Sequence, residues 1–187
     1  AFGPVDVWVN NAMTSVFSPF SEMSAEEFRR VTEVTYLRYF HGTMSALRSM
    51  LPRDKGVSVQ IGSALAYRSI PLQSAYCGAK HAIAGFTDSL RSELLHGGSN
   101  AKLTAVHMPA LNTPQFSRVL NRLPGKPQPV PPIFQPEVGV EAVYWAAHHY
   151  PRELLVGGPT LLAVIGQKFI PGLLDRYLAR TSYNWQQ

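Results

Sequence analysis

The sequence predicts an α/β fold in which helices cover a parallel, doubly wound sheet. Short apolar runs, typical of buried strands, recur at residues 5–9, 57–61, 103–108 and 154–157. Longer segments with the apolar spacing of helices lie between them, at residues 25–51 and 76–96. Strands that alternate with helices in this way are typical of parallel sheets.

The helix predicted at residues 25–51 has recognisable ends. Ser24 and Glu27 form a capping box after the loop expected at residues 14–23, and Pro52 opens the turn that ends the helix. Its apolar side chains keep helical spacing and are expected to face the core at Phe28, Val31, Val34, Leu37, Phe40, Met44, Leu47 and Met50.

The second half of the chain is less regular. Residues 112–136 are rich in proline and are expected to form a substrate lid, because so long a loop in a compact domain is either functional or disordered. A Pro-rich recognition ligand is the lesser alternative. A helix is expected to start at Pro136, and a C-terminal helical extension covers residues 159–187, with a break at Pro171.

Three side chains predict acid–base chemistry. Tyr76 and Lys80 are four residues apart and lie on one face of a helix. A neighbouring ammonium favours the phenolate and should lower the pKa of Tyr76, which makes this residue a candidate general acid or base. Ser63 ends the preceding strand and can reach the same substrate oxygen. The Tyr-x-x-x-Lys pair alone would also fit a half-buried tyrosine beside a surface lysine.

The order Ser63, Tyr76, Lys80 along a strand, a loop and a helix resembles the short-chain dehydrogenase/reductase family. The resemblance runs over nearly the whole chain and implies a Rossmann-like fold. It implies an NAD(P)-dependent oxidoreductase that interconverts a carbonyl and a hydroxyl, using NAD or NADP with a slight preference for NADP. In such an enzyme Tyr76 gives the proton, Lys80 also holds the nicotinamide ribose, and Ser63 orients the substrate oxygen.

Other family positions can be placed after the strands. Asn10, Asn11 and Ala12 match the first three residues of the family's Asn-Asn-Ala-Gly beside the cofactor, while Met13 replaces its glycine. Thr35 takes the place of an asparagine in the family's proton relay and keeps a hydroxyl that can bind water. Without the resemblance, the Asn-Asn pair would be interpreted as a turn.

A third match follows the strand at residues 103–108. Pro109 and Thr113 match a loop that meets the nicotinamide in the family, and Ala110 replaces a glycine there. The carboxyl end of a parallel strand is where α/β folds bind ligands, although a simple proline loop is the plain alternative.

The Gly-rich turn that binds a dinucleotide's pyrophosphate is missing, since neither Gly-x-x-x-Gly-x-Gly nor Gly-x-Gly-x-x-Gly occurs. We therefore expect residues 1–187 to be a single partial domain, truncated in its N-terminal half. It should hold the catalytic half of the site, bind cofactor poorly by itself and be inactive alone.

The charge and composition of the chain limit the classes of partner and ligand that the sequence predicts. Net charge is +5, but the basic residues are scattered, so nucleic-acid binding is not predicted. No run reaches about 18 apolar residues, which predicts no transmembrane segment. Cys77 is the single cysteine, and His148–His149 lack further ligands at metal-site spacing. We expect a cytoplasmic protein. The family resemblance implies a homodimer or homotetramer through helices 25–51 and 76–96.

Two alternatives to the oxidoreductase remain. The departures Met13, Thr35 and Ala110 would also suit a non-catalytic dinucleotide-binding scaffold, since fold does not imply function. An epimerase or dehydratase could use the same Tyr/Lys pair. The substrate is expected to be an apolar carbonyl or alcohol, because apolar residues surround the site at Met13, Leu65, Tyr67, Leu111 and Phe116. An additional hypothesis places residues 160–180 on a membrane surface.

Overall fold

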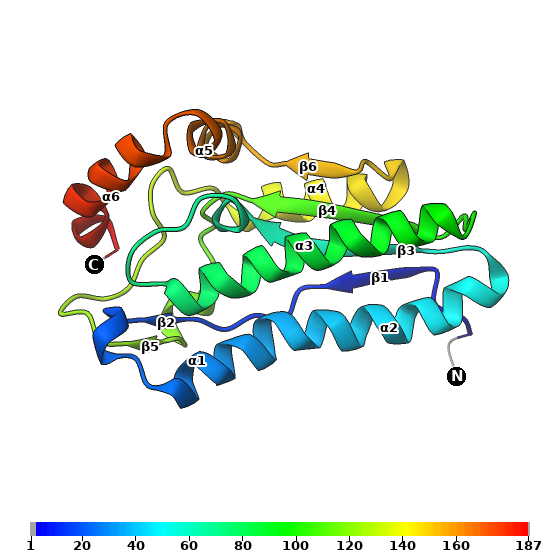
Figure 1. The fold of residues 1–187 in the computed structure, drawn as a ribbon, viewed down its shortest axis with the longest axis horizontal. Helices are drawn as coiled ribbons and strands as arrows, with labels where there is room; N and C mark the ends of the chain where they lie inside the picture. Colours follow the sequence, from blue (N-terminus) through cyan, green and yellow to red (C-terminus); the bar gives the residue numbers. More distant parts are fainter. Residues whose placement is uncertain (1–2, 187) are drawn as a thin grey trace.

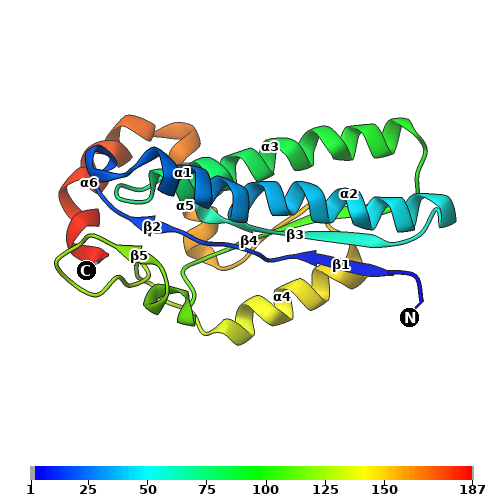
Figure 2. The ribbon, with the colours of Figure 1, turned by 90° about the horizontal axis from the view of Figure 1, so that it is seen from below.

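A four-stranded parallel sheet forms the centre of the protein, in a computed structural model that describes residues 3–186. The strand order is β1-β3-β4-β6, and the strands span Val7–Asn10, Val57–Ser63, Lys102–Met108 and Glu153–Leu155. Helices cover both faces, with α2 (Arg38–Met50) and α3 (Ser74–His96) on one and α4 (Pro136–His149) on the other (Figure 2). The predicted doubly wound α/β fold is confirmed.

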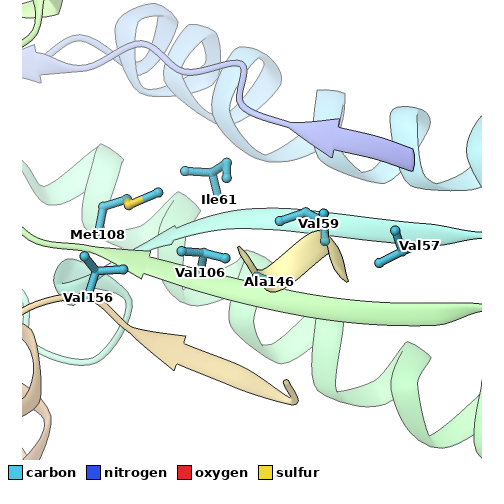
Figure 3. Close-up of a cluster of buried hydrophobic side chains, with 8 residues drawn as sticks. Val57, Val59, Ile61, Val106, Met108, Ala146 and Val156 are labelled. Atoms are coloured by element: carbon cyan, nitrogen blue, oxygen red, sulfur yellow. The ribbon is translucent and has the colours of Figure 1, made fainter. Parts of the chain in front are cut away.

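All four strands point the same way, so their carboxyl ends share one edge of the sheet (Figure 1). The register pairs Asn10 with Gln60 and Ser63 with Met108. Every residue of β3 is buried, including the polar Ser58, Gln60 and Ser63 that alternate with its apolar residues. Figure 3 shows the core that β3, β4 and the segment after β6 form with α4, made by Val57, Val59, Ile61, Val106, Met108, Ala146 and Val156.

The helix predicted at residues 25–51 is interrupted by a π turn. It runs as α1 (Ala25–Thr32), the π segment Glu33–Leu37 and then α2. The predicted capping box is present, since the Ser24 hydroxyl accepts from the Glu27 amide and the Glu27 carboxylate accepts from the Ser24 amide. A 3₁₀ turn at Leu51–Arg53 ends the helix.

The π turn corrects part of the predicted core. Phe28, Leu37 and Phe40 were expected to face inward, but they are 39%, 38% and 39% exposed. Phe28 precedes the π turn, whereas Leu37 and Phe40 lie at its end and after it. The wider turn shifts the phase of the residues that follow, because π hydrogen bonds span five residues rather than four. Tyr39 and Thr43 therefore face the interior and are buried.

The Pro-rich segment is attached to the loop after β1. β2 (Val16–Phe17) lies in the loop expected at residues 14–23 and pairs in parallel with β5 (Leu120–Asn121). A 3₁₀ turn at Pro114–Ser117 precedes β5. No sequence pattern indicated these two short strands, because two residues are too few to show a period.

The C-terminal extension consists of α5 (Gly158–Phe169) and α6 (Pro171–Trp185), with the break at the predicted proline. Both helices lie at the end of the molecule toward which the strands point (Figure 1). Among the described residues, none of the helices is both long and apolar enough to span a bilayer.

Candidate active site

Ser63, Tyr76 and Lys80 come together at the carboxyl end of β3. Ser63 is the last residue of the strand, and Tyr76 lies in the first turn of α3. The Ser63 and Tyr76 hydroxyls share a hydrogen bond, and the Ser63 oxygen also accepts the Leu65 amide at 3.1 Å. The Lys80 ammonium lies 5.6 Å from the centre of the Tyr76 ring. The strand–loop–helix order therefore places these side chains as the sequence suggested.

Burial controls the protonation of this group. It raises the pKa of the Tyr76 phenol above its ordinary value, and the hydrogen bond to Ser63 acts in the opposite direction. Burial also lowers the pKa of Lys80 to about 7. The expectation that Lys80 lowers the pKa of Tyr76 is thus wrong for this arrangement, because desolvation of the phenol outweighs the other influences. Tyr76 holds its proton at neutral pH, as a proton donor must.

Tyr39 is the side chain that sequence reasoning missed. Lys80 Nζ donates to the Ile61 carbonyl at 2.7 Å and to the Tyr39 hydroxyl at 3.3 Å. The Tyr39 hydroxyl in turn donates to the same Ile61 carbonyl at 3.0 Å. Tyr39 is fully buried, and its ring centre is 5.1 Å from the ammonium. It faces Lys80 because the π turn rotates α2, which the sequence pattern did not reveal.

Thr35 lies inside the π turn and serves the loop after β1. Its hydroxyl accepts the Thr14 amide at 3.0 Å and donates to the Thr14 carbonyl at 2.9 Å. Both hydrogen bonds of the Thr35 hydroxyl are therefore made with Thr14, and the hydroxyl that contacts Lys80 belongs to Tyr39.

Asn10 joins β1, β3 and α2 in the interior. Its amide nitrogen donates to Thr43 and to Gln60, each at 2.9 Å, and its oxygen accepts from Trp8 Nε1 at 2.8 Å. Gly42 packs against this amide, and a Cβ there would lie 2.4 Å from the Asn10 oxygen. The side chain thus steadies the sheet edge from which the following residues extend.

Two hollows flank the reactive group. The first has a volume of about 280 Å³, is lined mostly by apolar side chains and includes Met13, Ser63, Tyr76 and Pro109 in its wall. Its outer walls come from the Pro-rich segment and from α5 and α6. The predicted lid residues thus line this cavity, and Leu65 and Phe116 belong to it as well.

The second hollow lies at the strand ends and is larger and more open, with a volume of about 600 Å³. It is lined by Asn11, Ile61 and Thr113, together with residues of α4. Leu111 lines both this hollow and the first cavity, so one side chain separates them. Ala12 is half-buried between Asn11 and Met13.

A further buried cluster lies behind Ser63. The Tyr67 hydroxyl donates to the Glu153 carboxylate at 2.7 Å and lies 3.3 Å from His107 Nε2. Burial lowers the pKa of His107 and raises the pKa of Tyr67. His107 packs on Gly62, where a Cβ would come within 2.3 Å of its ring. Tyr67, expected at the substrate side, instead ties the loop after β3 to β4 and β6.

The remaining candidates are structural. His81 Nδ1 lies 2.9 Å from the Cys77 carbonyl one turn earlier on α3, and His148 and His149 make the same kind of contact on α4. Cys77 is buried. Within residues 3–186, no group of three or more potential ligands could hold a metal ion.

Comparison with known proteins decides the family. The model of the short chain dehydrogenase family matches residues 1–122. This chain belongs to the short-chain dehydrogenase family. An uncharacterised oxidoreductase of Bacillus subtilis, YxnA, is 30% identical over 188 residues, which cover 99% of this chain and 52% of YxnA. Human dehydrogenase/reductase SDR family member 7 is 38% identical over 93 residues, or 50% of this chain and 27% of the relative.

Solved structures show the same fold. A short-chain dehydrogenase from Streptomyces avermitilis has a TM-score of 0.74 at 23% identity, covering 94% of this chain and 70% of the other. A short-chain dehydrogenase from Burkholderia cenocepacia, solved in complex with NADP, has a TM-score of 0.72 at 21% identity, covering 92% and 70%. Compared with the sequence relatives, the chain spans about half the length of YxnA and a smaller part of the human relative.

Proposed function

We propose that this chain carries the catalytic half of an NAD(P)-dependent oxidoreductase that interconverts a carbonyl and a hydroxyl. The observation that carries the proposal is the hydrogen-bonded pair of Ser63 and Tyr76 in the wall of an apolar cavity, with Lys80 behind the phenol. Membership of the family makes this the expected chemistry.

The residues divide the proton chemistry among themselves. Ser63 donates a hydrogen bond to the substrate oxygen and holds it beside the phenol. Tyr76, kept protonated by burial, gives its proton to that oxygen as the carbonyl is reduced. The Lys80 ammonium faces the phenolate that remains and stabilises it electrostatically. The cofactor, when bound, supplies the hydride.

Lys80 can pass on a proton because its pKa is close to neutral. Tyr39 and the Ile61 carbonyl hold the ammonium toward Tyr76, since both accept hydrogen bonds from Nζ. We therefore assign Tyr39 the positioning of Lys80, in the place where the family resemblance suggested Thr35.

The residues present fit the nicotinamide half of a cofactor. Asn11 and Thr113 supply polar groups to the open hollow next to Ile61, and Leu111 separates that hollow from the substrate cavity. Lys80 would hold the ribose and Pro109 would border the ring. A Gly-rich turn of the kind that holds a dinucleotide's phosphates does not occur in residues 1–187, so the proposal covers the nicotinamide half alone.

The substrate proposed for the first cavity is an apolar ketone, aldehyde or alcohol. The lining around Ser63 and Tyr76 includes Met13, Leu65 and Phe116, which offer contact area but few hydrogen bonds. Arg68, the charged side chain in this lining, is already paired with Asp175 at 2.7 Å, so a small charged acid would lose its hydration there without gaining an unpaired cation.

The test is oxidation of NADH or NADPH by the full-length protein in the presence of apolar carbonyl compounds. Tyr76→Phe should lower kcat by about 10²–10⁴-fold, the usual contribution of a general acid, while cofactor affinity stays nearly unchanged. Tyr183→Phe, on the exposed side of α6, is the matched control. Turnover retained in Tyr76→Phe contradicts the proposal. If the protein binds cofactor but causes no net oxidation of NADH or NADPH, it is instead an epimerase or a dehydratase. If it turns over no carbonyl compound at all, it is a non-catalytic scaffold.

We also propose that α2 and α3 form the contact of a homodimer. Their outward faces enclose a shallow apolar hollow of about 680 Å³ lined by Phe40, Met44, Leu47, Phe86 and Leu90. Gly85 lies beside it with no atom within 4 Å of the Cβ position, which leaves room for a second backbone to approach.

A further inference from the structure

The outward faces of α5 and α6 carry an exposed apolar surface. Leu162 and Phe169 are 69% and 73% exposed. The surface as a whole, here called the α5–α6 face, consists of Leu161, Leu162, Ile165, Phe169, Ile170, Leu173 and Tyr177. Contiguous apolar surfaces of this kind are rare on proteins that stay free in water and mark a contact with a partner.

Charge narrows the choice of partner. No aspartate or glutamate occurs between Gly158 and Leu174. Lys168, Arg176 and Arg180 are exposed among the apolar residues, and the single acidic residue of α5 and α6, Asp175, is held by Arg68 at 2.7 Å. An apolar face with a cationic border suits a lipid surface that bears anionic headgroups.

The same helices are fixed to the rest of the protein. Arg68 donates to Gln167 on α5 and to Asp175 on α6, each at 2.7 Å. Gln186, at the end of α6, accepts from Gln73 at 2.7 Å and donates to the Pro71 carbonyl at 3.1 Å. Because both helices are held to the loop before α3, the α5–α6 face is presented outward on a rigid support.

The opposite side of these helices closes the substrate cavity. Thr160, Ala163, Leu174 and Leu178 line it from within. One helix pair therefore lies between an apolar cavity and an apolar outer surface.

We propose that the α5–α6 face docks onto an anionic lipid surface. The apolar side chains enter the boundary between headgroups and acyl chains, and Lys168, Arg176 and Arg180 contact anionic headgroups. A second copy of the chain is the less favoured occupant, because a two-fold symmetric contact would bring like cations of both copies together. That substrate reaches the cavity from the lipid is a consequence that rests on the proposed function.

The experiment is sedimentation of the full-length protein with vesicles of phosphatidylcholine and phosphatidylserine, compared with vesicles of phosphatidylcholine alone. The wild type should sediment with the anionic vesicles. The double variant Leu162→Glu, Phe169→Glu should bind at least about tenfold more weakly, because two charges must then enter an apolar boundary. Leu95→Glu, at a site on α3 that is 73% exposed, is the control and should bind as the wild type.

A second variant tests the cationic border without touching the apolar residues. Reversal of charge at Lys168, Arg176 and Arg180 should abolish the preference for phosphatidylserine and weaken binding by about tenfold or more. A wild type that does not sediment, or a double variant that binds as the wild type, overturns the proposal.

Sedimentation velocity distinguishes self-association through the α5–α6 face from binding to lipid. If the double variant changes a dimer into a monomer in sedimentation velocity and vesicles bind neither form, the face joins two copies and the lipid proposal is wrong. Activity on a water-soluble ketone is followed in parallel. Vesicle binding does not depend on turnover, so failure here and failure of the proposed function can be told apart.

Discussion

The Tyr39 hydroxyl lies 3.3 Å from Lys80 Nζ, and both groups bind the carbonyl of Ile61. This contact joins α2 to the helix that carries Tyr76 and fixes the direction of the ammonium. A buried ammonium needs hydrogen-bond acceptors, because it has lost those of water. Tyr39 therefore supplies part of what keeps Lys80 inside the protein.

Tyr39→Phe should impair catalysis through Lys80. Loss of one acceptor disfavours the charged form, so the pKa of Lys80 should fall further below its present value near 7. We expect kcat to fall by about 10- to 100-fold, in line with the roughly 1.5–3 kcal/mol of a hydrogen bond to a charged group, with little change in KM. The limb of the pH–kcat profile that reports Lys80 should move to lower pH.

The control for this prediction is Tyr36→Phe, which removes a hydroxyl from the same helix outside the contact with Lys80. An unchanged profile in Tyr39→Phe, measured with the full-length protein, would show that the hydroxyl only fills space.

Lys80→Met should stabilise the fold while removing activity. The folded state depresses the pKa of Lys80 from 10.5 to about 7, so the wild type pays its full desolvation cost at and below neutral pH. The cost decreases as pH rises toward 10.5, where the unfolded chain also loses the proton. The stability gained by the variant should therefore shrink by about 2 kcal/mol between pH 7 and pH 9, given about 1.4 kcal/mol per pH unit at most.

Urea unfolding of both proteins at several pH values measures this difference. A gain that stays constant across the range would mean that Lys80 titrates normally in the folded protein. Lys168→Met, at an exposed position of α5, is the matched control variant.

The sequence predicted the proximity of Ser63, Tyr76 and Lys80 better than it predicted the helix beside them. Ser63, Tyr76 and Lys80 could be placed because their order along strand, loop and helix is encoded in the chain itself. Tyr39 could not, because apolar spacing assumes a constant period, and the π turn at Glu33–Leu37 breaks that period. The wider π turn also explains why Phe40, which follows it, was wrongly assigned to the core.

The direction of the pKa shift at Tyr76 also could not be predicted from the sequence. Spacing shows that Lys80 is near, but it does not show how deeply both groups are buried, and desolvation decides the result. β2 and β5 were missed for a different reason, since their pairing joins segments about 100 residues apart without any local pattern.

Gly42→Ala tests the polar contact that holds Asn10. An added methyl group would lie 2.4 Å from the Asn10 oxygen and 3.0 Å from Trp8 Nε1, so the amide must move. We expect a loss of about 1–3 kcal/mol in the free energy of unfolding, which is typical of overpacking. Gly172→Ala, in the first turn of α6 where nothing lies within 4 Å of the added Cβ, should instead show no such loss. Equal effects in urea unfolding would disprove the steric argument.

Phe40→Arg should separate the proposed dimer. Phe40 is 39% exposed on the outward face of α2 and packs edge-on against Phe86 of α3, with ring centres 6.2 Å apart. In a two-fold contact through α2 and α3, each arginine would face apolar residues of the other copy and lose its hydration without a partner. Sedimentation velocity of the full-length protein should show a dimer for the wild type and a monomer for Phe40→Arg. Phe20→Arg, at a site that is 73% exposed before α1, should remain a dimer. A monomeric wild type, or a variant that stays dimeric, would place the subunit contact elsewhere or exclude it.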